Sequence, residues 1–190
     1  MSKPKVLKSV KRTKPVVIDN RTRILEAAAE IFIEKGYQAA SLENIAERVG
    51  LHKSTVYHYV KTKDEILYEC LKFSFTEYDE NMRMMEDRSM PPLRRLRLFF
   101  VHLTKILATT FGKCNPMIST QPLKGEMGGH IRTFQRQLDQ IVRRVLSEGI
   151  EDGSISNYKS GTLNAMLFGV FNWFPRWYSK DGIFTPEEIA

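Results

Sequence analysis

The side chains best suited to specific chemistry lie close together, between residues 52 and 63. They are His52, Lys53, Ser54, Thr55, Tyr57, His58 and Lys63. A lysine ammonium can donate to guanine O6 and N7, and hydroxyl groups can bond to base edges or to phosphate. Tyrosine and histidine side chains can bond to phosphate oxygens. The chemistry that this group supports is recognition of DNA, with residues 52–55 facing the bases.

The sequence around these side chains has the spacing of a helix-turn-helix. Ala46 is small where two helices would touch, and Gly50, four residues later, tolerates the positive φ of the turn. Inward apolar residues occur at the spacings that close the angle between the helices, namely Ile45, Val49, Leu51, Val56 and Tyr59. An ordinary helical hairpin is the alternative, and in it Tyr57 simply packs. Lys63 begins the next helix, where free backbone N–H groups favour an anion.

Enzymatic motifs are missing from the sequence. Lys53-Ser54 lacks the preceding glycine of a phosphate-binding loop, because His52 stands there. Neither HExxH nor GxSxG spacing occurs, and the glycines near residue 128 do not form a dinucleotide fingerprint. Cys70 and Cys114 are far apart in sequence, which indicates neither a disulfide framework nor a cysteine metal site. We therefore expect no enzyme activity, no cofactor and no metal.

The net charge of +7 is concentrated in the first third of the chain. Residues 1–63 contain 13 Lys+Arg and 6 Asp+Glu, whereas the remaining residues contain 16 of each. Most of the excess falls in residues 1–20, which we expect to form a flexible basic arm. Such asymmetry favours a polyanionic partner at the N-terminal end, although a tail that only keeps the protein soluble is the alternative.

Helical spacing of apolar residues dominates, and no strand pattern is convincing. We expect an all-α protein with helices at about 21–35, 42–49, 54–60, 62–85, 93–111, 131–153 and 159–177. An irregular stretch with at most a short helix is expected at 112–129. Thr185-Pro186-Glu187-Glu188 predicts the start of a further helix, which suggests that the sequence is truncated. No apolar run reaches the length of a membrane span and no secretory signal is present, so we expect a cytoplasmic protein that does not contact membranes.

Residues 24–67 resemble the N-terminal domain of the TetR family of bacterial transcriptional regulators. The match includes Gly36-Tyr37, Val49-Gly50-Leu51, Tyr57-x-Tyr59 and Lys63-x-x-x-Leu67. The resemblance implies that Ser41, Tyr57, His58 and Lys63 hold phosphates and that residues 52–55 face bases. Val60 departs from the family, which usually has phenylalanine there, and this affects packing rather than DNA binding.

The family resemblance also implies three segments: the arm at 1–20, a DNA-binding domain at 21–66, and an antiparallel helical domain for effector binding and dimerisation at 67–190. Gly161, Ala165 and Gly169 form a stripe that suits a homodimer seam or an intramolecular contact. An apolar effector cavity is expected, with a well-packed core as the alternative for each residue. The candidate lining is Phe99, His102, Leu103, Ile106, Phe134, Met166, Val170 and Phe174.

The segment from Trp173 onward is similar to the C-terminal region of TetR-type repressors of fatty-acid, steroid and aromatic-acid catabolism, several of which respond to acyl-CoA thioesters. The similarity rests on Arg176-Trp177-Tyr178, Gly182 and Thr185-Pro186-Glu187-Glu188. Cationic partners for CoA phosphates would be Arg132, Arg136, Arg143 and Arg144. The sequence thus predicts a repressor released from a palindromic double-stranded operator by a small hydrophobic effector, an acyl-CoA or a fatty acid. A multidrug-responsive repressor, an activator and an effector-less architectural protein are the alternatives.

Overall fold

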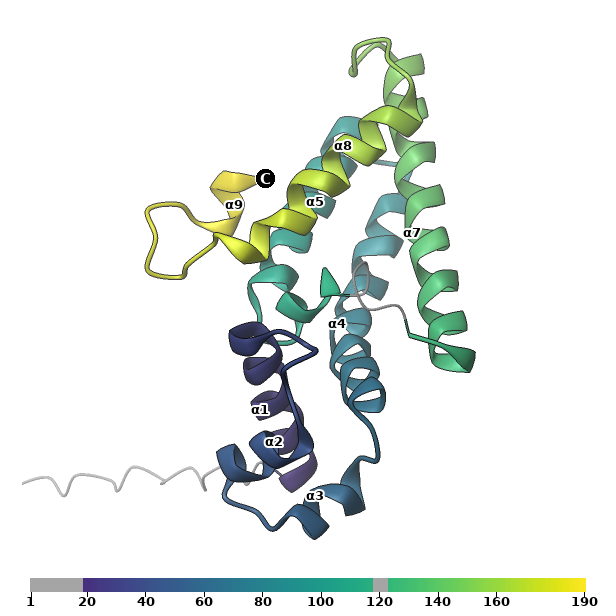
Figure 1. Ribbon diagram of the computed structural model, residues 1–190. Coiled ribbons are helices and arrows are strands. Elements are labelled where there is room, and N and C mark those ends of the chain that lie inside the picture. Colours follow the sequence, from purple (N-terminus) through teal and green to yellow (C-terminus); the bar gives the residue numbers. More distant parts are fainter. Residues whose placement is uncertain (1–18, 118–122) are drawn as a thin grey trace, which may run out of the picture.

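The computed structural model describes residues 19–117 and 123–190, and within these ranges the protein is all-helical, as expected (Figure 1). The helices are α1 (Asn20–Lys35), α2 (Leu42–Val49), α3 (Lys53–Tyr59), α4 (Lys63–Glu86), α5 (Pro92–Ala108), α7 (Gly125–Glu151), α8 (Ser160–Trp173) and α9 (Pro186–Ile189). Single 3₁₀ turns lie at Gly112–Cys114 and Phe174–Arg176. Residues 1–18 of the expected basic arm lie outside the described residues. None of the described helices is long and apolar enough to span a bilayer.

The first three helices form a small unit at one end of the molecule (Figure 1). Asp19 caps α1 by accepting from the Thr22 backbone N–H, and Ser41 caps α2 by accepting from Asn44 in the same way. Gly50 ends α2 in the left-handed conformation, with φ 68° and ψ 32°, so the expected turn is present. We call the apolar cluster inside this unit the N-terminal core; its members include Ile24, Leu25, Phe32, Ile45, Val56, Val60, Ile66 and Leu67.

Helix α4 links this unit to the rest of the protein. It has 24 residues, which corresponds to a length of about 36 Å. Its first turns contribute Ile66, Leu67 and Leu71 to the N-terminal core. Its later turns contribute Tyr78 and Met85 to a second cluster, the distal core, which α5, α7 and α8 complete. A single rigid element therefore joins the two cores.

Three helix boundaries differ from the expected ones. Helix α7 begins at Gly125, several residues before the expected start at 131, despite three glycines in its first turns. Close packing explains Gly128, because a Cβ there would lie 1.9 Å from the Leu123 carbonyl oxygen. Helix α5 stops at Ala108, and α8 stops at Trp173 before a 3₁₀ turn that contains Pro175.

The expected helix start at residue 185 is present as α9. Thr185 and Glu188 form a capping box, and Pro186 occupies the first turn. Helix α9 packs on α5, where Thr104 Oγ1 donates to the Pro186 carbonyl at 2.9 Å and Lys105 pairs with Glu187 at 2.8 Å.

Candidate nucleic-acid interface and ligand cavity

Helix α3 presents a polar surface at the end of the molecule farthest from α8 (Figure 1). His52, Lys53, Ser54 and His58 are exposed, and Thr55 is half-buried. The inward side is held by Val56, which is fully buried, while Tyr57 and Tyr59 pack at the edge of the N-terminal core. Because His52 makes no capping hydrogen bond, its ring is available at the N-terminal end of the helix. The exposed end of α3 thus gathers donors of the kind that read a major groove.

Lys53 already has an anionic partner in the free protein. Its Nζ pairs with Glu43 Oε1 on α2, and both side chains are about half exposed. The hydrogen bond that Lys53 donates to Glu43 raises the pKa of Lys53 and lowers the pKa of Glu43. Lys53 also lies over the ring of Tyr57, 5.6 Å from the ring centre. The Glu43 carboxylate therefore competes with DNA for this lysine.

Lys63 lies at the junction between the first unit and α4. Its Nζ donates to the carbonyls of Tyr37 at 3.0 Å and Gln38 at 3.1 Å. The Tyr37 hydroxyl in turn donates to Asp64 Oδ1, and burial together with this bond raises the pKa of Tyr37 above its ordinary value. An ammonium has three donors, so one is left for a phosphate. Through its bonds to the two carbonyls, Lys63 connects the start of α4 to the turn after α1.

Two further ion pairs hold α1 in place. Arg21 pairs with Glu69 of α4 at 2.6 Å, and Arg48 of α2 pairs with Glu34 of α1 at 2.7 Å. Ser41, the remaining expected phosphate ligand, is half-buried and uses its oxygen to cap α2. The pKa of Glu43 is lowered by its hydrogen bond with Lys53 and also by one with Ser41, so the Ser41 hydroxyl already has an acceptor in the free protein.

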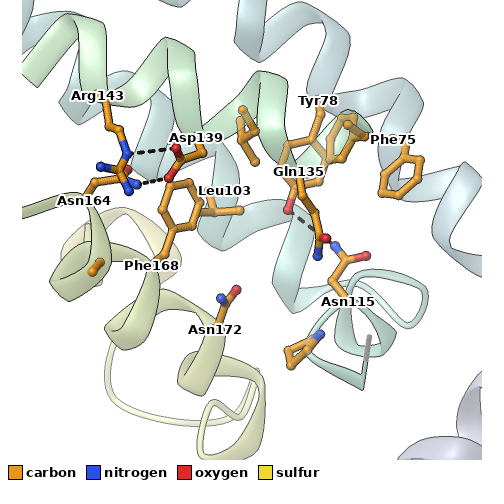
Figure 2. A pocket seen from close by; sticks show the side chains of 14 residues that line it. Phe75, Tyr78, Leu103, Asn115, Gln135, Asp139, Arg143, Asn164, Phe168 and Asn172 are labelled. Atoms are coloured by element: carbon orange, nitrogen blue, oxygen red, sulfur yellow. Dashed lines mark hydrogen bonds and ion pairs between the residues drawn. The ribbon is translucent and has the colours of Figure 1, made fainter. Parts of the chain in front are cut away.

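The second candidate site is a cavity of ≈ 310 Å³ between α4, α5, α7 and α8 (Figure 2). Its apolar lining is formed by Phe75, Leu103, Pro116, Phe134, Leu138, Ala165 and Phe168. Its polar lining is formed by Tyr78, Asn115, Gln135, Asp139, Arg143, Asn164 and Asn172. A concave site that combines apolar side chains with placed polar groups is typical of small-molecule binding.

Hydrogen bonds fix the polar side chains at the two ends of the cavity (Figure 2). At one end, Asp139 accepts from Arg143 Nε at 2.8 Å and from Asn164 Nδ2 at 2.5 Å. At the other end, Asn115 Nδ2 lies 3.4 Å from the Tyr78 hydroxyl, whose pKa is raised by burial. Gly161 makes room for Arg143, since a Cβ there would lie 2.5 Å from the guanidinium Nη1.

The comparisons with known proteins show the family of this chain. Residues 24–70 match the family described as "Bacterial regulatory proteins, tetR family", and residues 89–190 match "Tetracyclin repressor-like, C-terminal domain". This chain belongs to the TetR family. It is therefore a regulator that binds DNA through a helix-turn-helix, and the matched families describe regulators rather than enzymes.

Individual TetR-family relatives are similar to this chain over most of its length. The fatty acid metabolism regulator protein of Bacillus subtilis is 28% identical over 155 residues, which cover 79% of this chain and 78% of that protein. The repressor KstR2 of Mycobacterium tuberculosis is 24% identical over 181 residues, covering 92% and 88%. The structure of AibR with isovaleryl coenzyme A and operator DNA shares the fold, with a TM-score of 0.76, 22% identity and coverage of 90% and 94%.

Only part of the lining expected for an effector cavity lines this cavity. Leu103 and Phe134 line it, whereas Phe99, Ile106 and Phe174 are buried in the distal core around it and His102 is half-buried outside it. Met166 and Val170 were expected in the cavity, and this is wrong: they are 60% and 62% exposed on the opposite side of α8. Helix α8 is apolar around most of its circumference, so the spacing of its apolar residues does not identify its inner side.

Most of the polar lining was missed. Asn115, Gln135, Asp139, Asn164 and Asn172 come from three separate segments, and each taken alone has the pattern of a surface residue. Of the four arginines considered for CoA phosphates, Arg143 lines the cavity, Arg144 pairs with Glu86 at 3.0 Å, and Arg132 and Arg136 are exposed. The small residues expected to form one stripe on α8 have different surroundings. Gly161 faces Arg143 within the chain, whereas a Cβ at Gly169 would meet nothing within 4 Å.

Proposed function

We propose that this protein is a one-component transcriptional repressor that acts in the cytoplasm as a homodimer. Residues 21–66 bind operator DNA, residues 67–190 bind an effector and dimerise, and residues 1–20 form a basic arm that adds nonspecific attraction. His52, Lys53, Ser54 and Thr55 contact bases, and Ser41, Tyr57, His58 and Lys63 contact phosphates. A small hydrophobic effector, a fatty acid or an acyl-CoA, enters the cavity and releases the DNA.

The observation that carries this proposal is the course of α4. Its first turn contains Lys63 and Asp64, and both form hydrogen bonds with Tyr37 of the DNA-binding unit. Farther along the same helix, Phe75 and Tyr78 line the cavity. A ligand that displaces these aromatic side chains shifts the helix that orients α3. Effector binding thus favours a state in which the two reading helices no longer fit the operator.

An architectural protein without an effector would need no cavity, so the cavity favours the proposed repressor over that alternative. Its volume lies at the small end of the range for ligand sites, which suits a short or medium acyl group. A fatty-acid regulator and a structure with isovaleryl coenzyme A among the relatives support an effector of this class.

An exposed apolar face on α8 supports dimerisation. Met166, Val170 and Trp173 are 57–62% exposed at helical spacing, next to Ala165 and Gly169. A second copy of the same face would bury them. The twofold symmetry of such a dimer requires a near-palindromic operator with half-sites about one helical turn apart.

Selection of bound sequences from random DNA tests the proposal. We expect an inverted repeat, and native mass spectrometry of the selected duplex should show an even number of protein chains. Equal binding to all sequences would contradict it, as would a monomer on a single half-site.

A further inference from the structure

Two segments of the chain border more than one cavity. Asn115 and Pro116 line the cavity between α4, α5, α7 and α8, which we call the helical cavity, and Pro116 and Lys113 line a neighbouring cavity of ≈ 460 Å³. In the same way, Asn172 lines the helical cavity, and Arg176, shortly after it in the chain, lines the neighbouring one. The two cavities therefore share Pro116 as a wall and are bordered by the same two segments.

The neighbouring cavity lies where the DNA-binding unit joins the rest of the protein, and we call it the junction cavity. Part of its lining is Ile33, Gly36 and Tyr37 at the end of α1, and another part comes from the 3₁₀ turns that follow α5 and α8. These three elements lie close together in the middle of the molecule (Figure 1). Ile33 is 39% exposed and Tyr37 is half-buried, so both keep surface that a ligand can contact. A ligand in the junction cavity thus touches the DNA-binding unit directly.

Two cations and no carboxylate line the junction cavity. Lys113 is half-buried and Arg176 is exposed, and neither forms an ion pair with a described residue. The parts of the chain outside the described residues contain no Asp or Glu. The guanidinium of Arg176 lies over the ring of Trp173, 4.5 Å from its centre, and this stacking leaves the N–H groups at the guanidinium edge for hydrogen bonds. The junction cavity therefore has two uncompensated positive charges, which attract an anion.

The helical cavity offers a weaker position for an anion. Its cation is Arg143, which donates from Nε to Asp139 at 2.8 Å, so the two charges largely cancel. The Nη atoms of Arg143 are still available to an anion, but the Asp139 carboxylate, which is 42% exposed beside them, repels it. An anionic group is held better in the junction cavity, where no lining residue is acidic.

We propose that the two cavities form one site for an acyl-CoA, with the acyl chain in the helical cavity and the CoA phosphates in the junction cavity. This inference rests on the proposed function and narrows its effector class to a thioester that carries phosphates. The acyl chain packs on Phe134 and Phe168, and the neutral pantetheine arm passes Pro116. The phosphate oxygens accept hydrogen bonds from Lys113 and Arg176. A free fatty acid occupies only the helical cavity.

Binding of three ligands with the same acyl chain tests this assignment. Isothermal titration compares octanoate, octanoyl-pantetheine and octanoyl-CoA, of which only octanoyl-CoA carries phosphates. We expect the wild type to bind octanoyl-CoA at least about tenfold more tightly than octanoyl-pantetheine, because one charge-assisted hydrogen bond is worth about that factor. High salt should reduce this advantage, since salt screens charges that are exposed to solvent.

The double variant Lys113→Gln/Arg176→Gln removes both cations of the junction cavity. It should bind octanoyl-CoA and octanoyl-pantetheine with equal affinity, and its unchanged affinity for octanoyl-pantetheine should show that the helical cavity is intact. The matched control is Arg132→Gln/Arg136→Gln, which removes two exposed arginines of α7 that line neither cavity and should keep the advantage of octanoyl-CoA. Arg143→Gln should keep this advantage as well.

The proposal is overturned if the wild type binds octanoyl-CoA no more tightly than octanoyl-pantetheine, or if the double variant keeps the advantage. Loss of the advantage in Arg143→Gln alone would place the phosphates in the helical cavity and would also overturn it. Operator binding measured on the same samples separates the two levels. Release of DNA by octanoate or octanoyl-pantetheine as effectively as by octanoyl-CoA would preserve the proposed repressor function and reject the two-cavity site. Failure of all three ligands to bind would reject the effector class in both.

Discussion

The ion pair between Lys53 and Glu43 leads to a prediction that is counterintuitive for a protein that binds a polyanion through lysine. In the free protein Glu43 holds the lysine that is expected to read the operator. Lys53→Ala should weaken operator binding, because a base-edge contact is lost. Glu43→Gln should strengthen binding, because the carboxylate no longer competes with DNA for the lysine and because a negative charge near the phosphates is removed.

The magnitudes follow from the exposure of the pair. Lys53 and Glu43 are 54% and 49% exposed, so their attraction is screened and is worth about 0.2–1 kcal/mol. Glu43→Gln should therefore tighten operator binding by up to about fivefold. A good contact to a base edge is worth about 1–3 kcal/mol, so Lys53→Ala should weaken binding by about 5-fold to 150-fold and relax the sequence preference.

Fluorescence anisotropy with operator and scrambled duplexes measures both effects. Lys72→Ala is the matched control, because Lys72 is 52% exposed and also pairs with a glutamate, Glu69, at 3.2 Å, but lies on α4. Its substitution should leave operator affinity unchanged. Unchanged operator affinity in Lys53→Ala would refute the assignment of α3 as the reading helix, and weaker binding by Glu43→Gln would refute the competing role of the carboxylate.

Further predictions concern the arm, the fold and the dimer. Deleting residues 1–14 should weaken binding to all sequences alike and lower the salt dependence by about 0.9 per lost phosphate contact, measured by anisotropy at several salt concentrations. Gly128→Ala should destabilise the protein by about 1–3 kcal/mol in urea unfolding, because its Cβ would clash with a carbonyl, whereas Gly129→Ala, with open space around it, should not. Val170→Glu should give monomers in native mass spectrometry, and an intact dimer would reject the α8 face. Tyr37→Phe should lower the free energy of unfolding by about 1 kcal/mol at neutral pH. Because folding raises the pKa of Tyr37, the stability that this hydroxyl contributes is lost as pH rises above about 10. The variant should not show this loss of stability at alkaline pH.

The DNA-binding unit was the part most fully predicted from sequence, and the reason is local. Ala46, Gly50 and Val56 are constrained by backbone geometry and by contacts within a few residues, so their types alone specify the turn. Helix α2 and its cap at Ser41 follow from the same local rules. What spacing could not give is the partner of Lys53, because Glu43 lies on another helix and its rotamer is set in three dimensions.

The cavity was less predictable because its lining is assembled from distant segments. Asn115 follows a 3₁₀ turn, Asp139 lies in the middle of α7, and Asn164 lies on α8. Nothing in the spacing within one segment connects them. Helix α8 is apolar around most of its circumference, so the side that faces the cavity and the side that carries Met166 look alike in sequence. Packing against α7 decides between them.

The most direct test of the account is release of operator DNA by a ligand in the cavity. Labelled operator bound to the wild type is titrated with octanoyl-CoA and followed by anisotropy, beside a Gln135→Trp variant that fills the cavity from its exposed rim. The account predicts that the thioester weakens operator binding by the wild type at least about tenfold. It predicts that Gln135→Trp binds the operator normally and is not released. Equal release of both proteins, or no release of the wild type, would contradict it.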